Sequence, residues 1–253
     1  MDADIGKKIY FLYPHSVIQD EVVYEIVKNE YEAYLVRDHK KIVNELRENP
    51  DSILYVNIDD DNMTEPEWEK YVKNIMSDNT LQVRIGIMTY NNNQELAQKY
   101  LMELGVQCGF IVLKIGSDSS RRIILRTLEA NEAKGKRKFV RAQCVPGTAH
   151  FNIKYDGSQV NGEINDISSV GMSCSFSKSI DPPKGAFFKA VQLILKGKIV
   201  MVDAVIMGKR EMEEGGVLYV MLFGKNIQPI EKSKIHRFIY EALQQVLNNR
   251  LAI

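Results

Sequence analysis

The first part of the chain, to about residue 134, alternates short apolar runs with stretches whose apolar residues recur at helical spacing. The apolar runs are nearly continuous, which is typical of strands buried on both faces of a parallel sheet. They predict strands at Ile9–Tyr13, Tyr34–Val36, Ile53–Val56, Val83–Met88 and Phe110–Leu113. A helical pattern follows each strand, so we expect a flavodoxin-like (βα)5 domain of the α/β class over residues 1–134.

The rhythm changes after about residue 136. Phe151–Tyr155 and Gly162–Ile167 alternate apolar and polar residues with period two, and turn residues recur at Pro146-Gly147, Asp156-Gly157, Asn161-Gly162 and Gly215-Gly216. This pattern predicts an all-β antiparallel barrel or sandwich within residues 135–253.

A last helix ends the chain, with apolar residues at helical spacing: Ile235, Phe238, Ile239, Leu243, Val246 and Leu247. The stripe is wide enough to cover the open side of a small barrel, and a dimer seam is the alternative. Between the two halves lies the join Glu132–Lys136, where we expect a helix end running into a hinge, stopped by Gly135.

Composition and charge narrow the classes of function. The chain is 45% hydrophobic and 26% charged, which is ordinary for a globular protein. Its 33 Lys and Arg balance 33 Asp and Glu, so nucleic acid is an unlikely partner on grounds of charge. An anion bound by this protein must therefore meet a local basic cluster.

The N-terminus and the cysteines favour a cytoplasmic protein. The start of the sequence is acidic and lacks the features of a signal peptide, and no apolar run is long enough to cross a bilayer. Cys108, Cys144 and Cys174 are odd in number and widely spaced, so neither a disulfide framework nor a zinc site is expected.

The strongest candidate for a ligand-binding site begins at the join, where four cationic residues fall within six positions: Lys136, Arg137, Lys138 and Arg141. A charge run taken alone would be read as a solvated basic linker. Arg137 and Arg141, however, are spaced so that an irregular segment can present both guanidiniums to one compact anion.

A second element, Asp166-x-Ser168-x-x-Gly171, follows about two strands later, at the end of an apolar strand. Asp166 and Ser168 are two residues apart, so on a strand they project from the same face. Gly171 would then either adopt a positive φ or let a ligand approach the backbone closely.

RxxxR followed by (D/N)xSxxG resembles the signature of PilZ domains, small six-stranded antiparallel β-barrels that bind cyclic di-GMP. Both motifs are complete, and the resemblance covers roughly residues 134–250. It implies a PilZ barrel with a C-terminal helix in residues 135–253, and cyclic di-GMP as the ligand. The implied ligand residues are Lys136, Arg137, Arg141, Asp166, Ser168 and Gly171.

The chemistry of the ligand suits these residue types. Arginine can fork onto phosphate oxygens or onto guanine O6 and N7, and its flat face can stack on a base. The Asp166 carboxylate can accept hydrogen bonds from guanine N1 and N2, and Ser168 would offer a hydroxyl. Lys136 precedes the first motif arginine, at a place that in the family influences whether one ligand or a stacked pair binds, and the stoichiometry stays open.

The N-terminal half resembles response-regulator receiver domains. A working receiver needs an acidic pair after its first strand, an aspartate at the end of its third, and a Thr or Ser and a Lys after its fourth and fifth. Thr89 and Lys114 fall at the last two positions, but Tyr13–Ser16 contains no acidic residue, and the acceptor position is Val56 or Asn57 rather than Asp59. We therefore expect a receiver-like domain without phosphoacceptor function, serving as a surface for partner binding or dimerisation.

These features predict a cyclic di-GMP effector that is not an enzyme. Ligand binding at the hinge would rearrange the domains and alter the binding of a downstream protein partner, and the family resemblance suggests control of motility or virulence. The alternatives are a phosphorylation-regulated receiver protein and a PilZ-fold scaffold that binds no nucleotide. Neither a metal nor a cofactor beyond the ligand is expected, because no metal-ligand set, nucleophile–base pair or phosphate-binding GxxxxGK[ST] is present.

Overall fold

A computed structural model describes residues 6–16, 18–113, 117–212 and 215–252. The chain forms two compact units. The first comprises residues 1–138 and 247–253, and the second comprises residues 139–246. The division therefore falls between Lys138 and Phe139, and the last turns of the C-terminal helix belong to the first unit.

The first unit is built on a parallel sheet with the strand order β2-β1-β3-β4-β5 in the described part of the chain. The strands are β1 (Ile9–Leu12), β2 (Ala33–Val36), β3 (Ile53–Asn57), β4 (Arg84–Thr89) and β5 (Phe110–Val112). Every residue of β1 and β3 is buried, which explains their continuous apolar sequences. The order 2-1-3-4-5 is that of flavodoxin-like folds, so the first unit is compatible with the predicted architecture.

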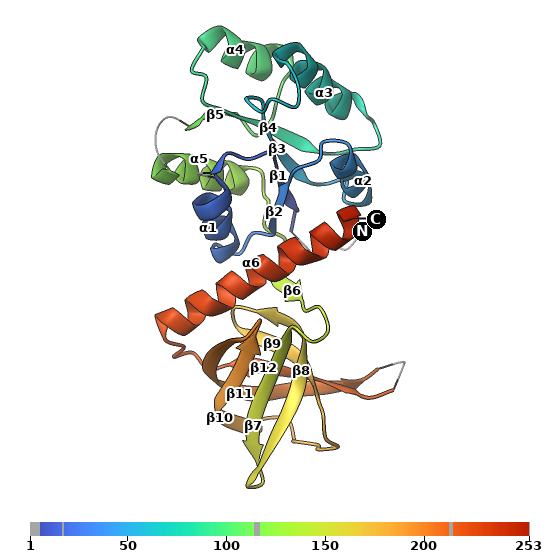
Figure 1. Cartoon of the computed structure of the whole chain (residues 1–253), viewed down its shortest axis with the longest axis vertical. Coiled ribbons are helices and arrows are strands. Elements are labelled where there is room, and N and C mark those ends of the chain that lie inside the picture. Colours follow the sequence, from blue (N-terminus) through green and yellow to red (C-terminus); the bar gives the residue numbers. More distant parts are fainter. Residues whose placement is uncertain (1–5, 17, 114–116, 213–214, 253) are drawn as a thin grey trace. The chain divides into compact units, whose positions relative to one another are not determined.

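Helices cover both faces of this sheet. In Figure 1, α1 (Val23–Lys28) and α5 (Ser117–Ala130) lie on one side, and α2 (Lys41–Glu48) and α3 (Glu65–Ser77) lie on the other. A short π-helical segment, Ile18–Val22, precedes α1, and α4 (Gln94–Gln98) continues into a second one, Lys99–Glu103. Trp68, the one tryptophan of the sequence, is fully buried on α3.

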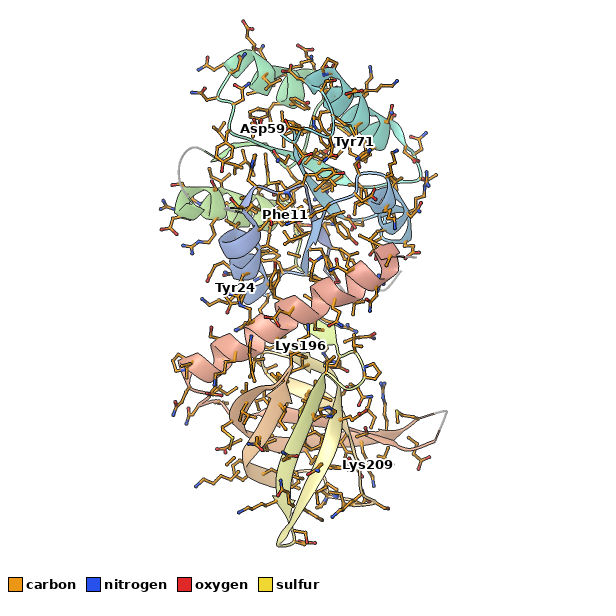
Figure 2. The ribbon with its side chains drawn as sticks, viewed as in Figure 1. Phe11, Tyr24, Asp59, Tyr71, Lys196 and Lys209 are labelled. Carbon is orange, nitrogen blue, oxygen red and sulfur yellow. The ribbon has the colours of Figure 1, made fainter. Side chains whose placement is uncertain are left out.

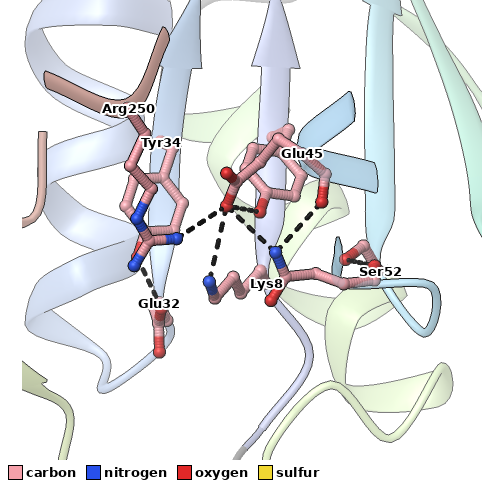
Figure 3. A network of polar contacts seen from close by, with 8 residues as sticks. Lys8, Glu32, Tyr34, Glu45, Ser52 and Arg250 are labelled. Atoms are coloured by element: carbon pink, nitrogen blue, oxygen red, sulfur yellow. Dashed lines mark hydrogen bonds and ion pairs between the residues drawn. The ribbon is translucent and has the colours of Figure 1, made fainter. Parts of the chain in front are cut away.

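A buried carboxylate ties the end of the chain to the first unit (Figure 3). Glu45 on α2 is only 4% exposed, and its Oε1 accepts hydrogen bonds from Tyr10 Oη at 2.9 Å and Asn49 Nδ2 at 3.0 Å. The same oxygen lies 3.5 Å from Lys8 Nζ and 3.2 Å from Arg250 Nη1. Several donors thus share one carboxylate, which offsets the cost of burying its charge.

The second unit is a closed antiparallel barrel. Its strands are β6 (Arg141–Gln143), β7 (Ala149–Tyr155), β8 (Ser158–Ser168), β9 (Gly171–Phe176), β10 (Phe187–Leu195), β11 (Lys198–Glu211) and β12 (Val217–Phe223). The order β8-β7-β10-β11-β12-β9 closes because β9 pairs with β8, so six of the described strands form the barrel and β6 adds to β8. The predicted period-two alternation holds along β7, where Ala149, Phe151 and Ile153 point inward.

Two predictions about glycines in the chain are wrong. Asn161-Gly162 is not a turn but part of β8: a Cβ on Gly162 would come within 2.3 Å of the Phe151 ring and of Ser175 O, so the glycine permits close packing within the barrel. Gly135 does not stop a helix either, because α5 ends at Ala130 and the left-handed residue is Glu132, with φ 50°.

The start of the join is held in place by the first unit. Lys7 N donates to Ala133 O at 2.8 Å, and the ammonium of Lys134 lies 4.7 Å from the centre of the Tyr31 ring. Ala133 and Lys134 are thus held by contacts within the first unit, and the segment that follows has no regular secondary structure up to β6.

The C-terminal helix α6 runs from Pro229 to Ala252. Ile235, Phe238, Ile239 and Leu243, which form most of the predicted apolar stripe, are buried within this chain. Among the described residues, no helix is both long enough and apolar enough to cross a membrane.

Candidate functional site

Three residues of the two motifs share one row across the barrel surface. Arg141 on β6 pairs with Ser168 on β8, and Ser168 pairs with Gly171 on β9. Ala142 and Ile167, the neighbours of Arg141 and Ser168, are fully buried, so the motif residues face outward. Strand pairing thus brings together residues that lie up to 30 positions apart.

Asp166 lies in the next outward row. It pairs with Gln143 on β6 and with Ser173 on β9, beyond a bulge that lies between Ile164 and Asp166. Because Ile167 points into the core, Asp166 and Ser168 project from the same outer face of β8, as their spacing predicts. Asp166 is half-buried whereas Arg141 is exposed, so a ligand in solution can reach both charges.

Ser173 holds the carboxylate of Asp166. Its hydroxyl donates to Asp166 Oδ2, which leaves Oδ1 to accept from another donor. Ser173 is 5% exposed, so this hydrogen bond is largely shielded from water. Ser173 was not identified from the sequence, although the period-two pattern continued beyond Gly171 places it on the same face as Asp166.

Ser168 shapes the turn between β8 and β9. Its Oγ donates to Gly171 O at 3.1 Å and accepts from Val170 N at 3.4 Å, and the side chain is 5% exposed. In this structure the hydroxyl therefore stabilises the tight turn that positions Asp166 and Gly171 on adjoining strands.

Gly171 is required by the approach of strand β12. The φ angle of Gly171 is not positive. A Cβ at this position would lie 2.4 Å from Met221 O and 3.1 Å from Leu222 Cδ2. Gly171 pairs with Leu222 in the ladder. Of the two roles considered from the sequence, the positive φ is thus wrong, and the close approach of a ligand stays a prediction.

Lys136 and Arg137 lie on the other side of the division between the units. Both are exposed residues of the irregular segment that precedes β6, and both belong to the first unit, which ends at Lys138. The structure brings Arg141, Asp166, Ser168 and Gly171 together on the barrel, and a contribution of Lys136 and Arg137 to the same site stays a prediction.

A shallow pocket of about 50 Å³ lies over the outward rows. It is lined by the four motif residues of the barrel and also by Ser173, Val220 and Leu222. A dinucleotide is far larger than this volume, so such a ligand would lie on an open surface with only one part of it seated in the pocket. Val220 and Leu222 were not identified from the sequence.

The two cysteine thiols near this surface have raised pKa values. Burial, and secondarily the negative charge of Asp166, raise the pKa of Cys144 to about 12. The same two causes raise the pKa of Cys174 still further. Both thiols are therefore protonated at neutral pH, and neither is poised as a nucleophile.

The carboxyl edge of the parallel sheet in the first unit has its own polar cluster (Figure 2). Asp59 accepts hydrogen bonds from Thr89 Oγ1 and from Tyr90 N, both at 2.5 Å, and lies 3.3 Å from His15 Nε2. β3 ends at Asn57, whose amide donates to Tyr13 O at 2.8 Å. Thr89 is thus a bonded strand-end residue, and Lys114 lies outside the described residues.

Neither unit shows a metal centre in its described residues: no three or more His, Cys, Asp or Glu side chains gather in a way that could hold an ion. The polar side chains that line the pocket on the barrel surface are one guanidinium, one carboxylate and two hydroxyls. Such a set is suited to recognising an anionic ligand that also carries hydrogen-bond donors.

Comparison with known proteins supports a specific domain. Residues 135–241 match the family model of the PilZ domain. Similar solved structures include the PilZ domain with c-di-GMP of YcgR from Escherichia coli, at 14% identity and a TM-score of 0.41, over 47% of this chain and 99% of that one. The MrkH–c-di-GMP complex of K. pneumonia is 15% identical with a TM-score of 0.39, over 48% of this chain and 57% of that one.

A third similar structure is the inhibitor of motility MotI/DgrA of Bacillus subtilis, at 13% identity and a TM-score of 0.36, over 45% of this chain and 52% of that one. The chain thus spans about half the length of MrkH and of MotI/DgrA. No curated protein sequence matches it. The PilZ domain at residues 135–241 is the part of the chain for which the comparisons assign a family.

Proposed function

We propose that this protein is a cyclic di-GMP effector that binds its ligand on the outer face of β6, β8 and β9. The observation that carries the proposal is the alignment of Arg141, Ser168 and Gly171 in one row, with Asp166 beside it, inside the segment that matches the PilZ domain. The two motifs are separate in the sequence and become one surface through strand pairing.

Each side chain has a chemical role on this surface. Arg141 is exposed and can fork onto a phosphate or onto guanine O6 and N7. Asp166 has one oxygen bonded to Ser173, and the other can accept from guanine N1–H or N2–H. Ser168 and Gly171 shape the turn between β8 and β9 and the floor of the pocket. A carboxylate that recognises two adjacent donors distinguishes guanine from adenine, which has no N–H at N1.

Lys136 and Arg137 would supply further positive charge from the segment before β6. Both are exposed in this structure, and the irregular backbone between them and Arg141 allows the segment to adapt to a bound anion. We propose that ordering this segment on the ligand changes the arrangement of the two units and the binding of a downstream protein. Solution scattering with and without cyclic di-GMP tests this step: the two profiles should differ, and identical profiles would contradict it.

We also propose that the protein is an effector rather than an enzyme. On the described barrel surface, the hydroxyl of Ser168 is bonded to Gly171 O, and the nearby thiols are held in their protonated forms by their raised pKa values. The carboxylate of Asp166 lies near both thiols, but its charge raises their pKa values and its Oδ2 is bonded to Ser173, so these groups supply no activated nucleophile for hydrolysis of the ligand. Control of motility or virulence stays a prediction from the family resemblance.

Calorimetric titration of Arg141→Ala tests the site. A bidentate arginine contact is worth roughly 1–3 kcal/mol, so affinity for cyclic di-GMP should fall by roughly 5- to 150-fold. Arg210→Ala is the matched control, because Arg210 is also an exposed strand arginine of the barrel and lies outside the pocket. Unchanged binding by Arg141→Ala would remove Arg141 from the site.

A further inference from the structure

Strand β12 breaks the pattern that governs the outer face of an antiparallel barrel. Outward positions of such strands are normally polar, because they face water. The outward residues of β12 are Val220 and Leu222, which are 38% and 40% exposed. Exposed apolar side chains at adjacent outward positions indicate a surface that something covers.

The strand register places these two residues beside the candidate ligand site. Leu222 pairs with Gly171, and Val220 pairs with Ser173. The rows described above therefore continue onto β12: one runs from Arg141 through Ser168 and Gly171 to Leu222, and the other from Asp166 through Ser173 to Val220. Both apolar residues line the same pocket as the motif residues.

The small residues of β9 turn these rows into a groove. Gly171 and Ser173, its first two outward residues, carry little or no side chain, whereas their neighbours on β8 and β12 are larger. Two strand spacings, roughly 10 Å, separate Asp166 from Val220. The carboxylate of Asp166 thus lies on one side of the small β9 residues, and the apolar side chains of Val220 and Leu222 lie on the other.

A purine base matches such a groove, because its edge carries hydrogen-bond donors while its two faces are apolar. We propose that Val220 and Leu222 form a third element of the ligand site, an apolar wall on which a guanine face packs, so that the plane of the base lies along the sheet and its edge points across β9 to Asp166. This inference rests on the proposed function and extends it to β12, which lies outside both motifs.

Matched threonine substitutions test the wall by calorimetry on the full chain with cyclic di-GMP. Val220→Thr is nearly isosteric and keeps a β-branched residue, so it removes apolar surface with little change of shape. Leu222→Thr should lower affinity about tenfold, the lower end of the effect of changing an apolar contact in a binding site. Val220→Thr should lower it by a smaller factor. Both should make the heat-capacity change of binding less negative, because less apolar surface is buried.

Two further variants separate the apolar wall from a general disturbance of the strand. Ile199→Thr removes an exposed apolar residue (50% exposed) elsewhere on the barrel and should bind as the wild type does. Leu222→Met keeps an apolar side chain of similar volume and should retain affinity. Loss with Leu222→Met as large as with Leu222→Thr would overturn the inference.

The outcome also distinguishes the inference from the function on which it rests. If the wild type binds, Arg141→Ala does not, and both threonine variants bind like the wild type, the apolar wall is wrong and the proposed function stands. If the wild-type chain does not bind cyclic di-GMP at all, both are overturned.

Discussion

Replacing Gly171 by alanine should destabilise the barrel because two strands approach each other too closely there for a side chain. The added Cβ would lie 2.4 Å from Met221 O, a backbone atom of the β9–β12 ladder, and 3.1 Å from Leu222 Cδ2. Ordinary van der Waals contact begins near 3.4 Å. The carbonyl must therefore retreat by about 1 Å, which strains or breaks ladder hydrogen bonds worth about 1 kcal/mol each.

The expected cost of Gly171→Ala is about 2 kcal/mol, in the range of overpacked cores. For a unit of this size that corresponds to a fall in Tm of roughly 10 °C. Differential scanning calorimetry measures it, and the fluorescence of Trp68, which reports the first unit, should change little. Gly208→Ala is the matched control, since a Cβ at Gly208 meets nothing within 4 Å and its φ is not positive.

The competing role of Gly171 gives a different result. If the glycine served only the approach of a ligand, Gly171→Ala would melt like Gly208→Ala and lose affinity for cyclic di-GMP alone. A normal Tm combined with lost binding would therefore refute the packing argument.

Three further predictions concern other contacts. Ser173→Ala removes the hydrogen bond to the Asp166 carboxylate and should weaken cyclic di-GMP binding about fivefold, the equivalent of about 1 kcal/mol. In the same titration, Ser175→Ala, which changes the next outward serine of β9, should alter affinity little. Equal effects of the two substitutions would show that Ser173 does not position Asp166. Glu45→Gln leaves Lys8 and Arg250 without their carboxylate and should lower the free energy of unfolding of the first unit by about 2 kcal/mol. Arg250→Ala should cost less, because the Arg250 side chain is 48% exposed. Urea unfolding followed by Trp68 fluorescence measures both variants, and a larger loss for Arg250→Ala would contradict the central role of Glu45. Because burial raises the pKa values of Cys108 and Cys144 to about 12, their alkylation by iodoacetamide at pH 8 should be much slower in the folded protein than in urea, and equal rates measured by mass spectrometry would contradict the raised pKa values.

Local patterns in the sequence predict most of the secondary structure and the shared face of the second motif. The continuous apolar runs of the first half mark its strands because both faces of that sheet are covered, and the two-residue spacing of Asp166 and Ser168 predicts their shared face. Both inferences use only neighbours in the chain, and both depend on periodicities that backbone geometry imposes.

The remaining features depend on pairings between distant segments. Val220 and Leu222 lie about 50 residues beyond Asp166 and Gly171, and only the β9–β12 register shows that they adjoin them. The same holds for Arg250 and Glu45, which are 205 positions apart. Gly162 and Gly171 resemble turn glycines in the sequence, whereas in the barrel they are strand residues selected by what lies across from them.

The central claim, binding of cyclic di-GMP to the PilZ domain surface, is tested most directly by isothermal titration of the full wild-type chain. Cyclic di-GMP is titrated beside GMP and cyclic di-AMP, and the same experiment measures how many ligands bind each chain. We predict saturable binding of cyclic di-GMP that is at least about fivefold tighter than that of either control, since one mismatched base contact costs about 1–3 kcal/mol. Absence of heat with cyclic di-GMP, or equal affinity for cyclic di-AMP, would contradict it.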